Sequence, residues 1–404
     1  MKILQINKFF YKRGGAEAYM LALSNMLRQQ GHQVVEFSMQ HPDNLESPYS
    51  DYFVKHIDFQ KRQGFFSDLK KSAHLLYSWQ ARNNLEKLIK KEKPDIAHLH
   101  NFYFQLTPSI LKVLKKYNIP MVWTMHDYKL ICPNYRLFTQ GRVCERCKAH
   151  KYYNCFTYKC MQNNSSYSFL VMLETYLHNL ILKSYDQIDL YISPSQFLQS
   201  KVAQWGINKV TQLYNFINLK DFEPDYNPGQ YLLYFGRLAE EKGLLLLLQA
   251  LREMPAVNLK IVGDGPQKQL LAKYIKEYNV NNVQLIGHTT GEKLYNLIKQ
   301  ARFVILPSIW YENNPISVLE AFALGKPVIG SDLGGIPELV KDGQTGVIFK
   351  ANDLNDLKDK INKNYNNLEQ ISQMGRQARL FVETNCAPQK HYEQIELIYK
   401  KLLK

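Results

Sequence analysis

Long apolar runs are missing from this chain of 404 residues. No run reaches the roughly 18 residues that a membrane-spanning helix needs, so we expect none. The opening stretch MKILQINKFF is too short in its apolar part for a secretory signal and is typical of a first β-strand. Low-complexity segments and short repeats are also missing, and a hydrophobic share of 45% is that of a folded protein. We therefore expect two or three domains and a cytoplasmic location.

Acidic residues are in short supply. The chain has 36 Asp and Glu against 51 Lys and Arg, which gives a net charge of +15. Residues 1–200 hold 26 basic against 15 acidic residues, and the remainder holds 25 against 21. The positive charge, which is concentrated in the first half of the chain, favours an anionic partner such as membrane headgroups, a lipid phosphate or a nucleic acid. A solvated basic face is the alternative.

Strand-like and helix-like patterns alternate twice along the chain, which indicates βαβ units and parallel sheets. The first series runs from KILQIN to DLYISPS, and the second from YLLYFGRL to GVIF. We predict an α/β fold of two doubly wound, Rossmann-like domains that face each other across a cleft. The domains are residues 1–200, with a loop-like, cysteine-rich insertion at 132–160, and residues 201–385. Ligands of such sheets bind beyond the carboxyl ends of the strands.

Two glutamates frame the segment YENNPISVLEAF. Glu312 precedes a proline, and Glu320 lies eight positions further on in a mostly apolar run. Eight helical residues rise about 12 Å, whereas the carboxylates of glycoside hydrolases lie about 5–9.5 Å apart. The spacing therefore disfavours a hydrolytic pair and favours one ligand gripped at both ends by carboxylates. A buried Glu320 paired with a nearby Lys or Arg is the alternative.

A helix is predicted between these glutamates. Asn313 or Asn314 is the expected N-cap, Pro315 suits the first turn, and Gly325 is a natural stop. The free N–H groups at such a helix start suit an anion, for example a diphosphate. A nucleoside diphosphate sugar has the matching layout of sugar, diphosphate and ribose.

The pattern around these residues resembles the retaining glycosyltransferase family 4 with its GT-B fold, most clearly over residues 231–350. The E-x7-E motif is Glu312 and Glu320, and further blocks are RGGAE with Gly14 and Gly15, TMHD with His126, FGRLAEEKG with Gly236, Arg237 and Lys242, and IVGDGP with Gly263 and Asp264. The resemblance implies an acceptor-side domain at 1–200, a donor-binding domain at 201–385, and a helix at 386–404 that crosses back to the first domain.

The resemblance also implies site residues. Catalytic roles fall to His126, Glu312, Arg237 and Lys242. Donor binding falls to Gly14, Gly15, Gly236, Arg237, Lys242, Gly263, Asp264, Glu312, Asn313, Asn314, Pro315, Ile316 and Glu320. Arg237 offers a fork and Lys242 a point charge for the diphosphate, so no metal or cofactor is required for catalysis. His126 would orient the sugar or the acceptor, and Asp127 is a weaker candidate.

The implied reaction is transfer of a sugar from a nucleotide sugar, with retention of anomeric configuration, to a glycan or lipid-linked acceptor in polysaccharide or cell-surface glycan synthesis. A UDP-sugar is the first expectation and a GDP-sugar the second. No nucleic acid is expected as a partner. The rival interpretations are another GT-B enzyme, such as a nucleotide-sugar epimerase, and a zinc-containing nucleic-acid-binding protein.

Five of the six cysteines lie between residues 132 and 160. Their spacing, with one C-x2-C pair, allows a structural zinc site at Cys144, Cys147, Cys155 and Cys160, with Cys132 and His150 as alternative ligands. Unligated thiols and disulfides are the other interpretations. His98 and His100 share one face of a strand, and a metal site there is a minor interpretation.

A cationic segment at residues 65–91, FFSDLKKSAHLLYSWQARNNLEKLIKK, carries aromatic residues and leucines at helical spacing. It predicts an amphipathic helix that touches an anionic membrane surface, which would make the protein peripheral at the inner face of the cell membrane. A helix that faces the core is the alternative.

Overall fold

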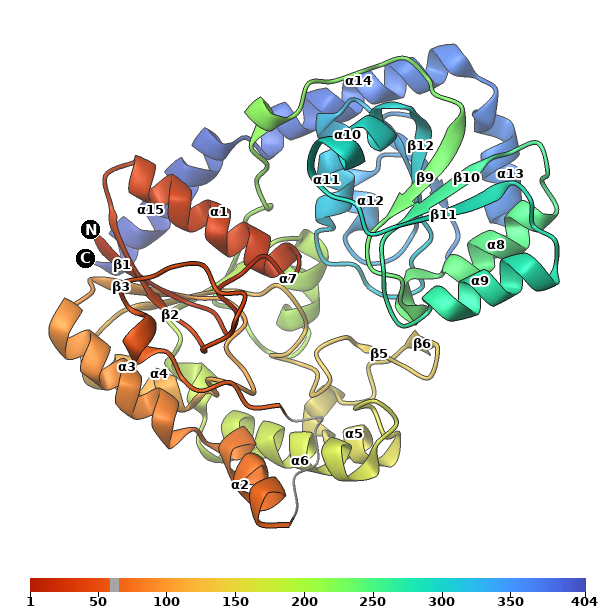
Figure 1. The fold of residues 1–404 in the computed structure, drawn as a ribbon. Helices are drawn as coiled ribbons and strands as arrows, with labels where there is room; N and C mark the ends of the chain where they lie inside the picture. The colour runs from red at the N-terminus through yellow and green to blue at the C-terminus, as the bar shows by residue number, and fades with distance from the viewer. Residues whose placement is uncertain (59–64) are drawn as a thin grey trace.

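The computed structural model describes residues 1–58 and 65–404. Within these residues, two six-stranded parallel sheets form the centres of two domains that lie side by side (Figure 1). The N-domain sheet has the order β2-β1-β3-β4-β7-β8, and the C-domain sheet has the order β11-β10-β9-β12-β13-β14. Both orders reverse direction partway across, as the predicted doubly wound topology requires.

Short apolar runs form the N-domain strands, which are buried because helices cover the sheet. The strands are β1 (Lys2–Ile6), β2 (Gln33–Phe37), β3 (Ile96–Leu99), β4 (Met121–Thr124), β7 (Leu190–Ser193) and β8 (Val210–Gln212). The helices between them are α1 (Gly15–Gln29), η1 (Ser50–Tyr52), α2 (Phe65–Leu76), α3 (Trp79–Glu92), α4 (Ser109–Lys116), η4 (Ser184–Gln187) and α7 (Gln196–Ala203). Since β8 pairs in parallel with β7, the first sheet extends past residue 200, where the sequence places the boundary.

The C-domain repeats the alternation. Its strands are β9 (Tyr231–Phe235), β10 (Leu259–Val262), β11 (Val283–Gly287), β12 (Ala301–Leu306), β13 (Val328–Ser331) and β14 (Gly346–Phe349). Its helices are η5 (Leu219–Asp221), η6 (Glu240–Lys242), α8 (Leu244–Arg252), α9 (Lys268–Glu277), α10 (Gly291–Lys299), α11 (Ile316–Ala323), α12 (Ile336–Leu339), α13 (Leu354–Tyr365) and α14 (Leu368–Asn385). One buried hydrophobic cluster joins these elements into a single core.

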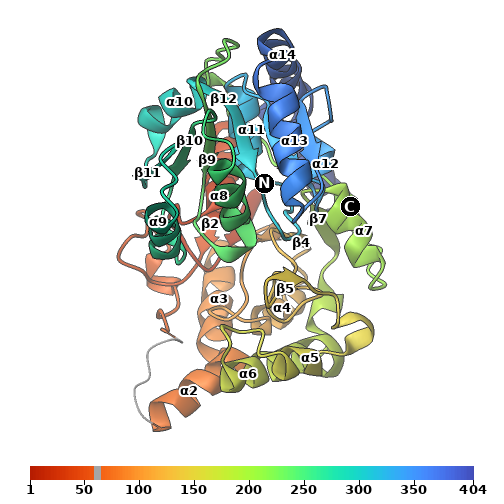
Figure 2. The same cartoon turned by 90° about the vertical axis from the view of Figure 1, so that its right-hand side faces the viewer.

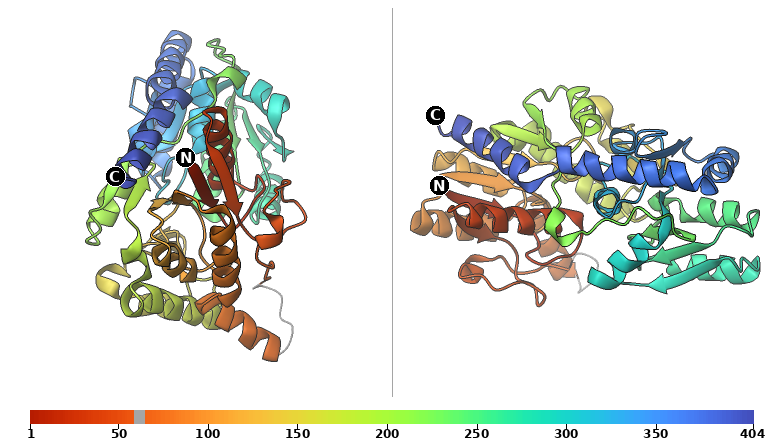
Figure 3. Two further views of the ribbon diagram at one scale, coloured as in Figure 1. Left: turned by 90° about the vertical axis from the view of Figure 1, so that its left-hand side faces the viewer. Right: turned by 90° about the horizontal axis from the view of Figure 1, so that it is seen from above.

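The last helix, α15 (Pro388–Leu402), leaves the C-domain and lies against α1 of the N-domain (Figure 3, right). Its Tyr392, Ile395 and Tyr399 share a buried cluster with Ile3 and Leu23. The two chain termini therefore lie close together (Figure 3), and the C-terminal segment ties the two domains to each other.

The cysteine-rich insertion has more regular structure than the loop that the sequence predicts. It contains the hairpin β5 (Phe138–Thr139) and β6 (Arg142–Val143), the turn η2 (Lys148–His150) and helix α5 (Tyr153–Thr157). Helix α6 (Ser165–Tyr176) and the π-helical turn η3 (Leu177–Ile181) follow it before β7. Together with α2, these helices form the lower edge of the N-domain in both Figure 1 and Figure 2.

The predicted amphipathic helix at residues 65–91 is two helices. Ser78 divides α2 from α3 because its side chain caps α3 by accepting a hydrogen bond from the Ala81 N–H. Helix α3 buries Leu85, Leu88 and Ile89 in the core, as the core-facing alternative expects. The side chains of residues 65–68 lie outside the described part of the chain. No helix in the described part is both long and apolar enough to span a bilayer.

Candidate active site

A cleft of about 300 Å³ lies where the two domains meet, at the carboxyl ends of strands from both sheets. The N-domain contributes the start of α1 and the loops that follow β3 and β4, and the C-domain contributes η6, the β12–α11 loop and the start of α11. Of the predicted site residues, the cleft wall contains Gly15, His126, Lys242, Glu312, Asn313, Asn314, Pro315 and Ile316.

An ion pair lies at the centre of the C-domain side. Lys242 Nζ donates to Glu312 Oε1 at 2.7 Å, and Ser308 Oγ donates to the same oxygen at 2.6 Å. Burial raises the pKa of Glu312, but the charge of Lys242 and the hydrogen bonds from Lys242 and Ser308 outweigh it and lower that pKa. Glu312 is therefore an ionised carboxylate, and its pair with Lys242 lies in the cleft wall.

Neither predicted asparagine caps helix α11. Its N-cap is Pro315, with no side-chain cap. The side chain of Asn313 instead joins the two domains, since its Nδ2 donates to Met125 O at 2.9 Å and its Oδ1 accepts from Ser195 Oγ at 2.7 Å. The cap prediction is wrong because these contacts with the N-domain compete successfully for the asparagine. They leave the first N–H groups of α11 facing the cleft.

Three amide side chains in the cleft wall have buried atoms without a hydrogen-bond partner in the described structure. They are Nδ2 and Oδ1 of Asn314, Oδ1 of Asn101 and Oδ1 of Asn215. A buried polar atom without a partner costs about 1–3 kcal/mol. Such atoms around one cavity are the mark of a site that a polar ligand completes. Asn101 and Asn215 were missed because they belong to no motif, although Asn101 directly follows the HLH strand.

His126 faces the cleft from the end of β4. Its Nε2 lies 3.0 Å from His100 Nδ1, and His100 Nε2 lies 2.7 Å from Gln5 Oε1. Burial lowers the pKa of His126 to about 3, so its ring is neutral. If the amide oxygen of Gln5 accepts from His100, then His100 accepts from His126, and Nδ1 of His126 presents an acceptor to a ligand.

His98, for which a metal site was a minor interpretation, instead makes two hydrogen bonds within the protein. Its Nδ1 lies 2.6 Å from the Tyr399 hydroxyl of α15, and its Nε2 lies 2.7 Å from Thr124 Oγ1. Both ring nitrogens are thus engaged by the protein. His98 links the C-terminal helix to the strand that carries His126.

Glu320 lies in the second turn of α11, is partly buried and does not line the cleft. In the described structure its carboxylate makes no hydrogen bond or ion pair, so the alternative of a carboxylate paired with Lys or Arg is not what the structure shows. Burial raises the pKa of Glu320 to about 7, and the charge of Lys12 opposes this only in part. This carboxylate is therefore free to accept hydrogen bonds from a ligand.

Arg237 lies outside the cleft wall, with 61% of its side chain exposed, and pairs with the buried Glu241 of η6. The other Glu241 oxygen lies 3.9 Å from Arg136 of the insertion. Gly141 of the β5–β6 hairpin also lies close to Glu240 of η6. The insertion thus touches the loop that holds Arg237 and Lys242, and β5 and β6 point toward the C-domain in Figure 1.

The predicted glycines have different roles. A Cβ on Gly15 would lie 3.3 Å from Ile316, so this glycine lets the two walls of the cleft approach. Gly14 is the N-cap of α1 and is absent from the cleft wall. Gly236 and Gly263 end β9 and β10, where a Cβ on Gly263 would lie 1.9 Å from Gly236 O. Asp264 is exposed, pairs with Lys268 at 2.7 Å and does not line the cleft.

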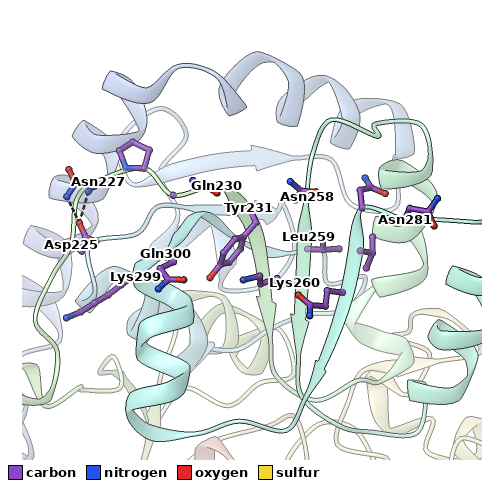
Figure 4. Close-up of a pocket in the computed structure, with 15 residues that line it drawn as sticks. Asp225, Asn227, Gln230, Tyr231, Asn258, Leu259, Lys260, Asn281, Lys299 and Gln300 are labelled. Carbon is purple, nitrogen blue, oxygen red and sulfur yellow. Dashed lines mark hydrogen bonds between the residues drawn. The ribbon is translucent and has the colours of Figure 1, made fainter.

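A larger depression, of about 840 Å³, lies at the opposite ends of the C-domain strands (Figure 4). It is an open, amide-rich surface that includes Gln230, Asn258, Asn281 and Gln300. None of the predicted site residues lines it. Since ligands of parallel sheets bind at the carboxyl ends of strands, we assign the active site to the smaller cleft.

The five insertion cysteines line one small cavity together: Cys132, Cys144, Cys147, Cys155 and Cys160. All six cysteines of the chain are free thiols in this structure. Within the described residues, no group of three or more His, Cys, Asp or Glu side chains is placed to hold a metal ion. The structural zinc at Cys144, Cys147, Cys155 and Cys160 therefore stays a prediction.

Metal analysis of the purified protein tests that prediction. A structural zinc gives about one zinc per chain by mass spectrometry, and Cys144→Ser with Cys147→Ser removes it and lowers the melting temperature. The change Cys386→Ser, at a buried thiol outside the insertion, is the control for generic loss of a buried cysteine. Zinc-free wild-type protein with unchanged stability in the presence of a chelator contradicts the prediction.

Two family models match the chain. The model of glycosyltransferase family 4 matches residues 13–221, and that of glycosyl transferases group 1 matches residues 216–381. An uncharacterized glycosyltransferase of Methanocaldococcus jannaschii is 28% identical over 48% of this chain and 54% of its own length. An Escherichia coli UDP-Gal:alpha-D-GlcNAc-diphosphoundecaprenol alpha-1,3-galactosyltransferase is 25% identical over 76% of this chain and 74% of its own.

Solved structures agree on the fold. A sucrose-phosphate synthase from Thermosynechococcus elongatus superposes with a TM-score of 0.75 at 18% identity, covering 99% of this chain and 98% of that one. An Anabaena protein solved with UDP and glucose superposes with a TM-score of 0.66 at 18% identity, covering 99% and 100%. The GT-B fold predicted from the sequence is confirmed.

Proposed function

The chain belongs to glycosyltransferase family 4, and from this premise we propose that it transfers a sugar from a UDP-sugar to a glycan or lipid-linked acceptor with retention of anomeric configuration. The observation that carries the proposal is the set of unpartnered amide atoms of Asn101, Asn215 and Asn314 around the Lys242–Glu312 pair, in a cleft shared by both domains. A donor with many hydroxyl and phosphate oxygens supplies the partners that these groups lack.

We place the donor in the cleft in one orientation. The diphosphate lies at the start of α11, where free N–H groups and Lys242 face it. The transferred sugar lies toward Glu312 and His126, and the ribose lies toward Glu320. The choice of UDP is supported by the Anabaena structure with UDP and glucose and by the Escherichia coli relative, whose name specifies UDP-galactose.

The chemistry that this layout supports is electrostatic. Lys242 and the start of α11 stabilise the negative charge that develops on the departing diphosphate, and Arg237 adds charge once its loop closes on the donor. Glu312 and neutral His126 hold the sugar hydroxyls in place. A proton from the acceptor hydroxyl passes to the leaving diphosphate on the same face of the sugar, so the new bond keeps the configuration of the old one.

The acceptor enters from the N-domain side. The insertion hairpin reaches η6 beside the donor loop, so the insertion forms one border of the approach. A lipid-linked acceptor is supported by the Escherichia coli relative, whose name specifies a diphosphoundecaprenol-linked sugar. The protein would then work at a membrane surface in the assembly of a cell-surface glycan.

Proton NMR of the products tests the proposal. The protein is incubated with a panel of α-linked UDP- and GDP-sugars and hydroxyl acceptors, and the anomeric proton of each new glycoside is recorded. We expect one UDP-sugar to give an α-linked product, with the small anomeric coupling constant of an α-gluco or α-galacto linkage. A β-linked product overturns retention, and a GDP-sugar as the preferred donor overturns the assignment of the base.

A further inference from the structure

The helix that follows the cysteine-rich insertion is apolar on both of its faces. Helix α6 buries Val171, Met172 and Thr175 against the N-domain, and Figure 2 shows it packed beside α2 and α5. A helix that is apolar all round needs a partner on its outer side as well. In the described structure, the outer side of α6 faces solvent.

The exposed apolar side chains form a continuous stripe. Phe169 and Leu173 are four residues apart and share one face of α6, and the exposed Leu180 follows in η3. Phe156 of α5 packs edge-on against Phe169, with ring centroids 5.4 Å apart. Phe169 is 44% exposed, and Ile181 at the end of the stripe is 71% exposed. Exposed patches of this kind mark an interaction surface.

The rim of this stripe is basic. Residues 146–183 contain five Lys and Arg and one acidic residue, Glu174. Glu174 is buried and neutralised by Lys129 at 2.6 Å. Lys151, Lys159 and Lys183 are all exposed, whereas the Lys148 ammonium lies over the ring of Trp205. An apolar stripe bordered by lysines complements an anionic lipid surface, where aromatic and aliphatic side chains enter the headgroup boundary and lysines meet the phosphates.

We propose that the outer face of α5, α6 and η3, here called the lipid face, docks the protein onto an anionic bilayer. A second copy is the poorer occupant, because a two-fold contact would bring two identical lysine rims together. Tyr153 of α5 is also exposed, and the exposed Trp79 at the start of α3 lines one hollow together with Leu177 of η3. The face differs from the one that the sequence predicts, since the apolar side chains Leu85, Leu88 and Ile89 of α3 pack inward.

The lipid face goes beyond the proposed donor chemistry, because none of its residues lines the cleft. It gives that chemistry a location, since docking would place a lipid-linked acceptor beside the N-domain. The lower edge of the N-domain in Figures 1 and 2 is then the side that meets the membrane. The Arg136 contact with Glu241 connects the same insertion to the donor loop.

Vesicle co-sedimentation tests the proposal. The full chain is mixed with vesicles of phosphatidylglycerol and phosphatidylcholine, and with vesicles of phosphatidylcholine alone. We expect binding to the anionic vesicles that weakens with salt. The triple change Phe156→Ser, Phe169→Ser and Ile181→Ser should lower the partition coefficient by about tenfold or more. Leu380→Ser with Leu397→Ser, at exposed positions on α14 and α15, is the matched control and should bind like wild type.

Two further comparisons make the outcome decisive. Lys151→Gln with Lys159→Gln should weaken binding severalfold, whereas Lys273→Gln with Lys276→Gln, at exposed lysines of α9, should not. Each variant is also tested for UDP binding, which shows independently of vesicle binding that the variant is folded and that its cleft is intact. Wild-type protein that ignores anionic vesicles overturns the proposal, as does a triple variant that binds like wild type. Loss of a dimer in the triple variant, with vesicle binding intact, assigns the face to self-association instead.

Discussion

Replacing Lys242 by methionine should lower kcat/KM for sugar transfer by roughly 10²–10³, the effect of removing a preorganised charge from a developing anion. The structure gives the reason, since Lys242 is the cleft lysine next to the start of α11 and is held at 2.7 Å by Glu312. Steady-state kinetics with the identified UDP-sugar measure the loss. The fall should appear mainly in kcat, because the charge on the diphosphate grows in the transition state.

The same change also destabilises the fold, and this must be separated from catalysis. Removing Lys242 leaves Glu312 as a buried charge without its cationic partner, at a cost of about 3–5 kcal/mol. Adding Glu312→Gln removes that charge, so the double variant should recover most of the melting temperature while staying inactive. Lys268→Met breaks an exposed pair of the same length, with Asp264, and should alter neither property. Recovery of activity together with stability would mean that Lys242 acts only on the fold.

Glu320→Gln should make the protein more stable and a weaker binder of the donor. Burial raises the pKa of Glu320 in the folded chain to about 7, from 4.5. The folded state therefore holds this proton more tightly than the unfolded state, and the carboxylate destabilises the fold progressively as the pH rises from about 4.5 to about 7. Glutamine carries no such charge. The stability gain of the variant should be near zero at pH 4 and up to about 3 kcal/mol at pH 8.

Urea denaturation of both proteins at pH 4, 6 and 8 measures this difference. The affinity for UDP should respond in the opposite sense, since an ionised Glu320 is the better acceptor for ribose hydroxyls. Wild-type affinity should rise as the pH increases through 7, and that of Glu320→Gln should stay flat. A stability difference that does not depend on pH would show that Glu320 is not titrating near neutrality, and a parallel rise in the variant's affinity would remove it from the donor site.

The sequence predicted the residues whose positions depend on local pattern. His126 ends a strand, Lys242 follows a glycine-bordered strand end, and Glu312 precedes a helix-starting proline, so the parallel topology brings all three to one edge. The alternation of strands and helices was enough to predict two parallel sheets, although it ended the first one before β8. Glu312 lies in the loop before α11 and Glu320 in the second turn of that helix, as the sequence predicted.

Contacts between distant segments could not be predicted in this way. Asn313 leaves its expected capping role because Met125 O and Ser195 Oγ approach it from the other domain. Asn101 and Asn215 enter the cleft from chain segments with no motif of their own. Arg237 was expected in the cleft, but in this structure it turns to Glu241 and remains largely exposed. Each difference reflects a tertiary partner that no local pattern encodes.

The insertion shows the same limit on a larger scale. The cysteine spacing singles out residues 132–160. The exposed apolar face lies beyond that range, in α6 and η3. This outer face becomes visible only once the inner face is known to be occupied.

Titration calorimetry of UDP is the most direct test of the central claim that the cleft between the domains holds the donor diphosphate. Wild-type protein should bind UDP at one site, and Asn314→Ala should weaken it by about tenfold without lowering the melting temperature, because the change removes two unpartnered buried atoms. Asn281→Ala, in the larger depression at the opposite end of the C-domain, should bind like wild type. Unchanged affinity in Asn314→Ala with reduced affinity in Asn281→Ala would place the nucleotide in the other depression and contradict the account.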